Sequence, residues 1–165
     1  MIKPIEHWLT LDQHGIQMPW YVRPFLQELI TWNLKDKYIF EYGCGYSSLW
    51  YRSRGALLYG VDNNETWASL SGVRYEPDEN WYLESISFLN VKFDIVIIDG
   101  TWRDRCTKYA LKRLVNGGKL IIDNWEQPSV EPNDWTETKE LIKWMDIEVY
   151  KEPTHPDWKT AVITK

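Results

Sequence analysis

Residues 93–100 have the sequence Phe-Asp-Ile-Val-Ile-Ile-Asp-Gly, an almost unbroken β-branched run that ends at an acid and a glycine. Runs of this kind are typical of strands that are buried on both faces of a parallel sheet. Shorter runs of the same type occur at residues 37–41, 57–61, 73–75 and 120–122, and apolar residues at helical spacing lie between most of them. This alternation predicts an α/β fold, a doubly wound, mostly parallel sheet with helices on both faces.

The two ends of the chain depart from this alternation. Residues 147–150 and 160–164 are strand-like with no helical pattern between them, which predicts a C-terminal antiparallel hairpin. Residues 1–36 are irregular up to Pro24 and helical after it, so we expect a lid and helix segment before a core of residues 37–165. A length of 165 residues fits one domain. Asn116-Gly117-Gly118 is expected to end a helix.

Composition excludes several classes of partner. The net charge is −5, which disfavours nucleic acid, and no apolar run approaches the roughly 18 residues of a membrane span. The two cysteines, Cys44 and Cys106, suggest neither a disulfide framework nor a zinc site, so a cytoplasmic protein is expected. There are eleven tryptophans, and we expect some to line a pocket or an interface, with core packing as the alternative.

Polar groups follow four of the predicted strands. The first strand runs into Glu41-Tyr42-Gly43-Cys44-Gly45-Tyr46-Ser47-Ser48, the second ends at Asp62, the fourth at Asp99 and the fifth at Asp123-Asn124. Ligands of open parallel sheets bind outside the carboxyl ends of the strands. The sequence therefore predicts a ligand site where these groups converge.

The glycine loop and Asp62 indicate the kind of ligand. Gly43 and Gly45 allow a close backbone approach, and the helix that follows favours an anion. Asp62 lies 17 residues after Gly45, where a carboxylate can bind ribose hydroxyls. These features fit any adenosine-bearing cofactor. A dinucleotide is disfavoured, because Ser48 replaces the third glycine and Glu41 would repel a pyrophosphate.

Together, Glu-x-Gly-x-Gly at 41–45, Asp62, residues 93–100, Asn-Gly-Gly-Lys-Leu-Ile-Ile-Asp-Asn at 116–124 and the hairpin resemble class I S-adenosylmethionine-dependent methyltransferases. The resemblance covers residues 37–165 and implies a Rossmann-like, seven-stranded sheet whose last strand inserts beside the fifth. It also implies an enzyme with S-adenosyl-L-methionine as cofactor, whose ribose Asp62 would hold. The candidate cofactor-binding residues are Glu41, Gly43, Cys44, Gly45, Tyr46, Ser47, Asp62, Asn63, Asp99 and Trp102.

The type of transfer depends on residues 99–105. The Pro-Pro-Tyr motif of amino-group enzymes and the Pro-Cys nucleophile of cytosine enzymes are absent, and Asp-Gly-Thr-Trp-Arg-Asp-Arg is similar to the catechol O-methyltransferase pattern. There, residues at the places of Asp99, Asp123 and Asn124 hold Mg²⁺ and a lysine is the base. Arg103 stands near that lysine's place and cannot lose its proton. Asp99 and Asp123 remain candidate catalytic residues, and a divalent cation is an alternative that we do not favour.

The expected function is methyl transfer to a small-molecule acceptor, at oxygen. Candidate acceptor residues are Trp20, Tyr21, Arg103, Asn124 and Trp125, with lid or core packing as the alternative for the aromatic ones. Two other functions stay open: a different nucleotide-binding Rossmann-like protein, and a non-catalytic module that binds a partner through its aromatic surface. A homodimer that completes the acceptor pocket is also open.

Overall fold

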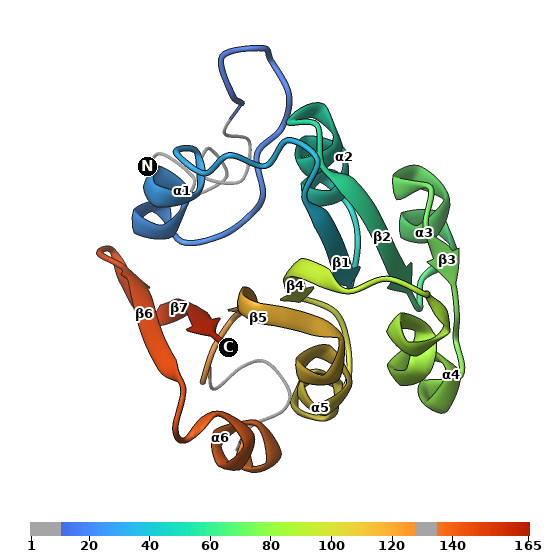
Figure 1. Ribbon diagram of the computed structural model, residues 1–165. Coiled ribbons are helices and arrows are strands. Elements are labelled where there is room, and N and C mark those ends of the chain that lie inside the picture. Colours follow the sequence, from blue (N-terminus) through green and yellow to red (C-terminus); the bar gives the residue numbers. More distant parts are fainter. Residues whose placement is uncertain (1–10, 128–134) are drawn as a thin grey trace.

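The computed structural model describes residues 11–127 and 135–165. At its centre is a seven-stranded sheet of order β3-β2-β1-β4-β5-β7-β6 (Figure 1). Only the pairs β5–β7 and β6–β7 are antiparallel, so β7 alone runs against the other strands. This confirms the predicted fold class and the insertion of the last strand beside β5. The strands are β1 (Tyr38–Tyr42), β2 (Leu57–Asp62), β3 (Arg74–Tyr75), β4 (Phe93–Ile98), β5 (Leu114–Asp123), β6 (Asp146–Glu152) and β7 (His155–Thr164).

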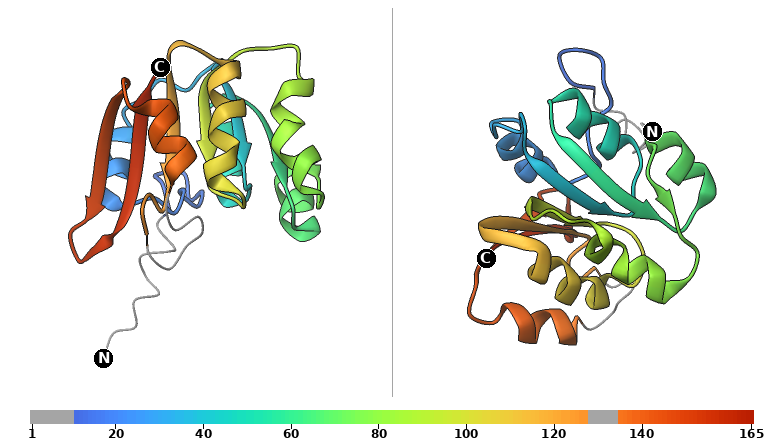
Figure 2. Two further views of the ribbon diagram at one scale, coloured as in Figure 1. Left: turned by 90° about the horizontal axis from the view of Figure 1, so that it is seen from below. Right: turned by 45° about the vertical axis from the view of Figure 1, so that its right-hand side comes forward.

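Helices cover both faces of the sheet. The helices α4, α5 and α6 lie side by side on one face (Figure 2, left), whereas α1 and α2 pack on the other and α3 lies beside α2 near β2 and β3. The helices are α1 (Arg23–Leu29), α2 (Tyr46–Ser53), α3 (Glu65–Ser71), α4 (Glu79–Glu84), α5 (Arg103–Arg113) and α6 (Thr136–Ile142), and a 3₁₀ helix η2 (Ser85–Phe88) follows α4. No helix among the described residues is long and apolar enough to cross a membrane.

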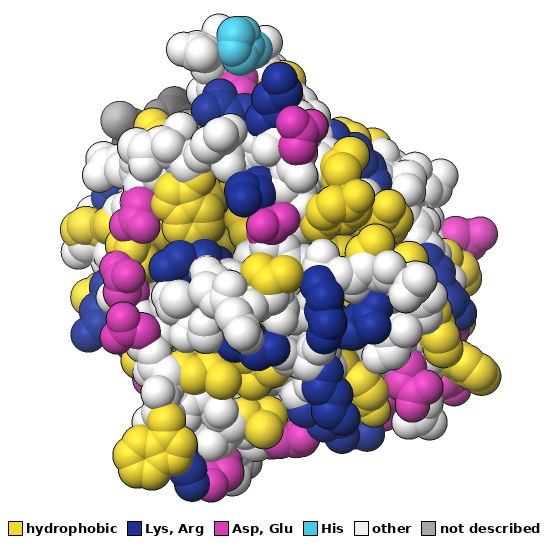
Figure 3. Space-filling model, in the orientation of Figure 1, with side chains coloured by type: hydrophobic (Ala, Val, Ile, Leu, Met, Phe, Trp, Pro, Cys, Tyr) yellow, Lys and Arg dark blue, Asp and Glu magenta, His cyan; other side chains and the backbone are white. Residues whose placement is uncertain are grey.

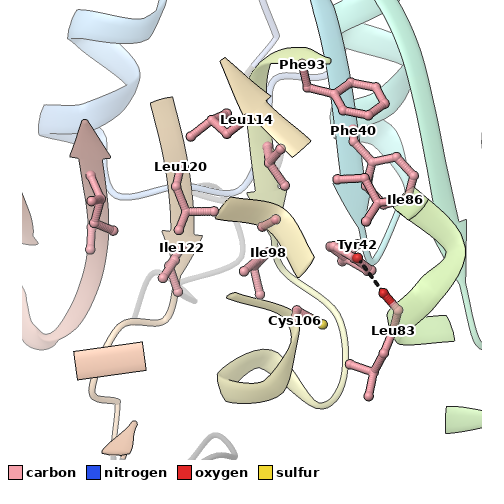
Figure 4. Packing of buried hydrophobic residues seen from close by; sticks show 14 of the residues in the cluster. Phe40, Tyr42, Leu83, Ile86, Phe93, Ile98, Cys106, Leu114, Leu120 and Ile122 are labelled. Carbon is pink, nitrogen blue, oxygen red and sulfur yellow. Dashed lines mark hydrogen bonds between the residues drawn. The ribbon is translucent and has the colours of Figure 1, made fainter. Parts of the chain in front are cut away.

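The β-branched run of β4 is buried because successive residues face the two helical layers. Ile95 and Ile97 pack with α1 and α2, while Val96 and Ile98 pack with α4 and α5. On the face covered by α4 and α5, the Tyr42 hydroxyl donates a hydrogen bond of 2.7 Å to the Leu83 carbonyl and so fixes β1 against α4 (Figure 4). Because both of its faces are buried, β4 requires apolar residues at successive positions and not an alternation of polar and apolar ones.

The sequence-based prediction missed α4 and η2. The carboxylate of Asp78 accepts hydrogen bonds from the backbone N–H groups of Asn80 and Trp81 and so caps α4. An aspartate just before a helical segment is a recognisable start signal. Nearby, Glu76 pairs with Arg74 at 2.7 Å.

The expected helix stop at residues 116–118 is wrong. Helix α5 ends earlier, at Arg113, and residues 116–118 belong to β5. The chain end explains this: the Gly117 N–H donates to the Lys165 carbonyl, and the Lys165 N–H donates to Gly118. Pairing with the C-terminus keeps this glycine-rich stretch extended. The hairpin strands are also longer than predicted, so that only residues 153–154 join them.

Of the expected N-terminal segment, residues 1–10 lie outside the described residues. In the remainder, α1 buries Phe25 and Leu29 against the sheet. Arg23 forms an ion pair with the buried carboxylate of Glu152, which ties α1 to the hairpin. Residues 18–20 lead from this helix toward the carboxyl ends of the strands, where the site lies.

Candidate functional site

A cavity of about 370 Å³ opens at the carboxyl ends of β1, β2 and β4. We call it the first cavity. It brings together most of the predicted cofactor residues, and none of its lining residues is a lysine or arginine. The lining residues are Met18, Trp20, Gly43, Cys44, Gly45, Tyr46, Ser47, Asp62, Asn63, Asn64, Trp67, Asp99 and Gly100.

Gly43 determines how closely the loop after β1 approaches the loop after β4. Its φ is +81°, and a Cβ atom at this position would collide with the backbone of Gly100. Both the positive φ and the close approach require glycine. The glycine loop can therefore lie against the end of β4 and leave the space of the first cavity above it.

Asp62 is fixed in the wall of the first cavity. Its side chain is buried, its Oδ2 accepts a hydrogen bond of 2.8 Å from the Cys44 N–H, and its Oδ1 accepts one of 2.7 Å from the Asn64 N–H. A carboxylate has about four acceptor positions, so two remain for a ligand. The backbone bonds hold the group in one orientation, which suits recognition of a pair of hydroxyls.

Glu41 lies beneath the glycine loop and is not part of the cavity lining. It is fully buried and accepts a hydrogen bond of 2.6 Å from Ser47 Oγ and a second from Ser48 Oγ. Burial raises the pKa of Glu41 to about 7, against the lowering effect of these bonds. The structure therefore places Glu41 as an anchor for the start of α2, and it explains Ser48, which a third glycine could not replace.

Arg103 fills the space between the ends of β4 and β5. Its Nε donates to the Gly100 carbonyl at 2.7 Å, and Nη1 donates to the Asp123 carbonyl at 2.7 Å and to Asn124 Oδ1 at 2.8 Å. Nη2 donates to the Asp99 carbonyl at 3.0 Å and lies 3.2 Å from Asp99 Oδ1. The guanidinium thus donates four hydrogen bonds within the protein, and its charge pairs with Asp99. Arg103 lines neither cavity, so the structure does not bring it together with the other predicted acceptor residues.

The residues proposed for Mg²⁺ do not fit an ion. Asp99 Oδ1 and Asn124 Oδ1 face the Arg103 guanidinium, and Asp123 Oδ1 accepts a hydrogen bond of 2.6 Å from Thr160 Oγ1. Among residues 11–127 and 135–165, no cluster of three histidine, cysteine or acidic side chains could hold a metal. We therefore derive no step through a metal ion.

Burial changes the acidity of the two strand-end aspartates. It raises the pKa of Asp123 to about 8, and the negative charge of Asp99 adds to the effect. It also raises the pKa of Asp99, which the Arg103 charge partly counteracts. A carboxyl group with a pKa near 8 can exchange protons at physiological pH. Asp123 consequently has the chemistry of an acid or base.

A second cavity of about 240 Å³ lies next to the first, and Trp20 lines both. It contains three predicted acceptor residues, Trp20, Tyr21 and Asn124, together with Asp123. Trp125 lies elsewhere: it is buried, and its ring centroid is 4.9 Å from that of Trp135. The complete lining of the second cavity is Trp20, Tyr21, Val22, Asp123, Asn124, Gln127, Trp158 and Lys159.

The remaining predicted cofactor residue, Trp102, is not in the lining of the first cavity. Its φ is +49°, and its ring packs against Tyr82 with the centroids 5.2 Å apart. Eight lining residues were not predicted from the sequence: Met18, Asn64, Trp67 and Gly100 in the first cavity, and Val22, Gln127, Trp158 and Lys159 in the second. Only Asn64 carries a local signal, because its side chain caps α3 by accepting from the N–H groups of Thr66 and Trp67.

Comparisons with known proteins agree with this architecture. No protein-family model and no curated protein sequence matches the chain. Among solved structures, it is similar to an O-methyltransferase from Bacillus cereus in complex with SAH, with a TM-score of 0.62, 16% identity, and coverage of 100% of this chain and 83% of that chain.

Two other solved structures are similar over most of their length. An rRNA methylase from Streptococcus thermophilus has a TM-score of 0.61 and 12% identity, with 86% of this chain and 94% of that chain covered. Precorrin 8W decarboxylase from Methanobacterium thermoautotrophicum has a TM-score of 0.61 and 16% identity, with both chains covered to 100%. The chain thus has the fold of the class I S-adenosylmethionine-dependent methyltransferases, as the sequence resemblance predicted.

Proposed function

We propose that the protein is an enzyme that binds S-adenosyl-L-methionine in the first cavity and transfers its methyl group to a small-molecule acceptor, at oxygen. The observation that carries the proposal is the joint geometry of Gly43 and Asp62. The backbone at Gly43, which can approach a ligand closely, lines the same cavity as the Asp62 carboxylate, which has acceptor positions left for a ligand. The similarity to an O-methyltransferase in complex with SAH supports this choice of cofactor.

The reaction makes modest demands on the chain. Displacement at a sulfonium methyl group requires that the acceptor atom is aligned with the carbon–sulfur bond and that its proton is received. Asp99 lines the first cavity and Asp123 the second, and these two carboxyl groups are the candidates to receive that proton. Met18 and Trp20 contribute to the wall of the first cavity, so the part of the N-terminal segment that contains them acts in this proposal as a lid on the core of a single domain.

The charge distribution supports a small acceptor over a nucleic acid, although the similar structures include an rRNA methylase. Lys159 is the single cation among the residues that line the two cavities. Lysine and arginine side chains gather instead over the region of α5 (Figure 3). The side chains of Lys92, Arg113 and Lys165 hydrogen-bond backbone carbonyls of residues 91, 111, 112 and 114, near the start of β5 and away from the cavities.

Isothermal titration with S-adenosylhomocysteine and with NAD tests the cofactor. We expect S-adenosylhomocysteine to bind and NAD not to bind. Asp62→Asn should weaken S-adenosylhomocysteine binding about tenfold or more, because it removes a charge-assisted pair of hydrogen bonds.

Asp94→Asn is the matched control for that variant. Asp94 also accepts from a backbone N–H, that of Tyr38 at 2.9 Å, but it lies at the opposite end of the sheet. Its substitution should leave the affinity unchanged. Equal binding of NAD, or an Asp62→Asn variant that binds S-adenosylhomocysteine as the unsubstituted protein does, contradicts the proposal.

A further inference from the structure

The second cavity is close enough to the first for a ligand bound in one to contact a ligand bound in the other. Asp99 lines the first cavity and Asp123 the second, and each follows directly on a residue of the paired positions Ile98 and Ile122 of β4 and β5. Neighbouring strands are about 4.8 Å apart. A ligand in the second cavity is therefore about one strand spacing from the end of β4, and the Trp20 ring lines both cavities.

The size and walls of the second cavity suit one aromatic ring. A cavity of about 150 Å³ is large enough to hold benzene. The second cavity, at about 240 Å³, leaves room for a ring with two small substituents. Trp20, Tyr21 and Trp158 line it, and aromatic side chains bind other rings favourably in stacked or edge-to-face contacts.

Two polar groups in the lining differ in charge and define where substituents would bind. Asp123 is buried, and Thr160 holds its Oδ1 at 2.6 Å, so the carboxyl group has a fixed orientation. Lys159 shares Glu126 with Lys139, whose Nζ is closer, at 2.6 Å against 3.6 Å. This group of two lysines and one glutamate carries one more positive charge than negative charge, and Lys159 is the member that lines the cavity.

We propose that the second cavity binds the methyl acceptor and that this acceptor is a hydroxylated aromatic carboxylate. This inference rests on the proposed function. Its ring contacts Trp20 and Trp158, its hydroxyl binds Asp123, and its carboxylate pairs with Lys159. In the transfer, a bond forms between the acceptor oxygen and the methyl carbon, and the carbon–sulfur bond breaks with its electron pair staying on sulfur. The hydroxyl proton passes to the Asp123 carboxylate.

One hydroxyl is sufficient for this acceptor. The Arg103 guanidinium occupies the space between Asp99 and Asn124, so no metal ion is available there to chelate a vicinal pair of hydroxyls. We therefore expect a monohydroxylated ring to bind as well as its catechol analogue.

The test uses the full chain saturated with S-adenosylhomocysteine and titrated with 2-, 3- and 4-hydroxybenzoate, with benzoate, and with 4-hydroxybenzylamine. At least one hydroxybenzoate should bind about tenfold or more tightly than the other two compounds, because benzoate lacks the hydroxyl and the amine reverses the charge. Lys159→Met should remove most of the preference for the carboxylate. The matched control, Lys143→Met, removes a lysine that pairs with Glu140 outside the cavity, and it should leave the preference intact.

The outcomes separate the two proposals. If S-adenosylhomocysteine does not bind, the proposed function fails. If it binds but no hydroxybenzoate binds, or if the amine binds equally well, only the present inference is overturned. An unchanged preference in a folded Lys159→Met variant also overturns it, and the comparison of ligands decides the matter if that variant does not fold.

Discussion

Replacing Arg103 by alanine tests the account of the strand ends most directly. The side chain is 8% exposed and carries the positive charge beside Asp99, whose own side chain is 27% exposed. Removing one partner of a buried ion pair costs about 3–5 kcal/mol, and the partial exposure of Asp99 favours the lower end of this range. We expect the free energy of unfolding to fall by about 3 kcal/mol and the melting temperature by roughly 6–12 °C.

The same substitution should create a site for a hard cation. Without the guanidinium, Asp99 Oδ1, Asn124 Oδ1 and the carbonyls of Asp99, Gly100 and Asp123 remain around the vacated space. These are all oxygen atoms, the ligands that Mg²⁺ and Ca²⁺ prefer. Millimolar Mg²⁺ or Ca²⁺ should therefore raise the melting temperature of Arg103→Ala and leave that of the unsubstituted protein unchanged.

Differential scanning fluorimetry with and without EDTA measures both effects. Arg105→Ala is the control, because Arg105 lies on the same helix and pairs with Glu79 at the surface, where an ion pair contributes about 0–1 kcal/mol. The reasoning is refuted if Arg103→Ala melts at the same temperature as Arg105→Ala. Equal stabilisation of the unsubstituted protein by the cation would show that its metal site is available with Arg103 in place.

Three further predictions concern the loop and the sheet. Glu41 has a pKa raised from 4.5 to about 7, so the folded state binds more protons than the unfolded state between these values. Stability should therefore fall as pH rises through this range, by up to about 3 kcal/mol, and urea unfolding at pH 5 and pH 8 should show a smaller fall for Glu41→Gln. Gly43→Ala should lower the melting temperature well beyond Gly15→Ala, which has a similar positive φ (+75°) but nothing within 4 Å of the new Cβ; equal effects would show that the approach to Gly100 is unimportant. Truncation after Trp158 removes most of β7 from between β5 and β6. Thermal unfolding followed by circular dichroism should then no longer be cooperative. A truncated chain that still melts cooperatively would show that the fold does not depend on β7 as a central strand.

Local sequence was sufficient for the elements whose signals are carried by neighbouring residues. The run at residues 93–98 is β4 to the residue, because both of its faces are buried and its composition shows this directly. The sequence also predicted that the glycine loop and Asp62 converge, and both line the first cavity, since strand ends in a parallel sheet lie at one edge. Asp78 also carries a local capping signal, at the start of α4.

Tertiary structure decided the features that depend on contacts between distant segments. Trp125 follows Asn124 directly, yet Asn124 lines a cavity and Trp125 packs in the core against Trp135. Trp158 and Lys159 reach the second cavity because β7 runs antiparallel beside β5. Whether Arg103 binds an acceptor, leaves a metal site open or joins two strand ends depends on where its N–H groups find their hydrogen-bond acceptors. These acceptors are on residues 99–100 and 123–124. Sequence shows which groups stand at the ends of strands, but the pairing of their charges is determined only when the sheet brings those ends together.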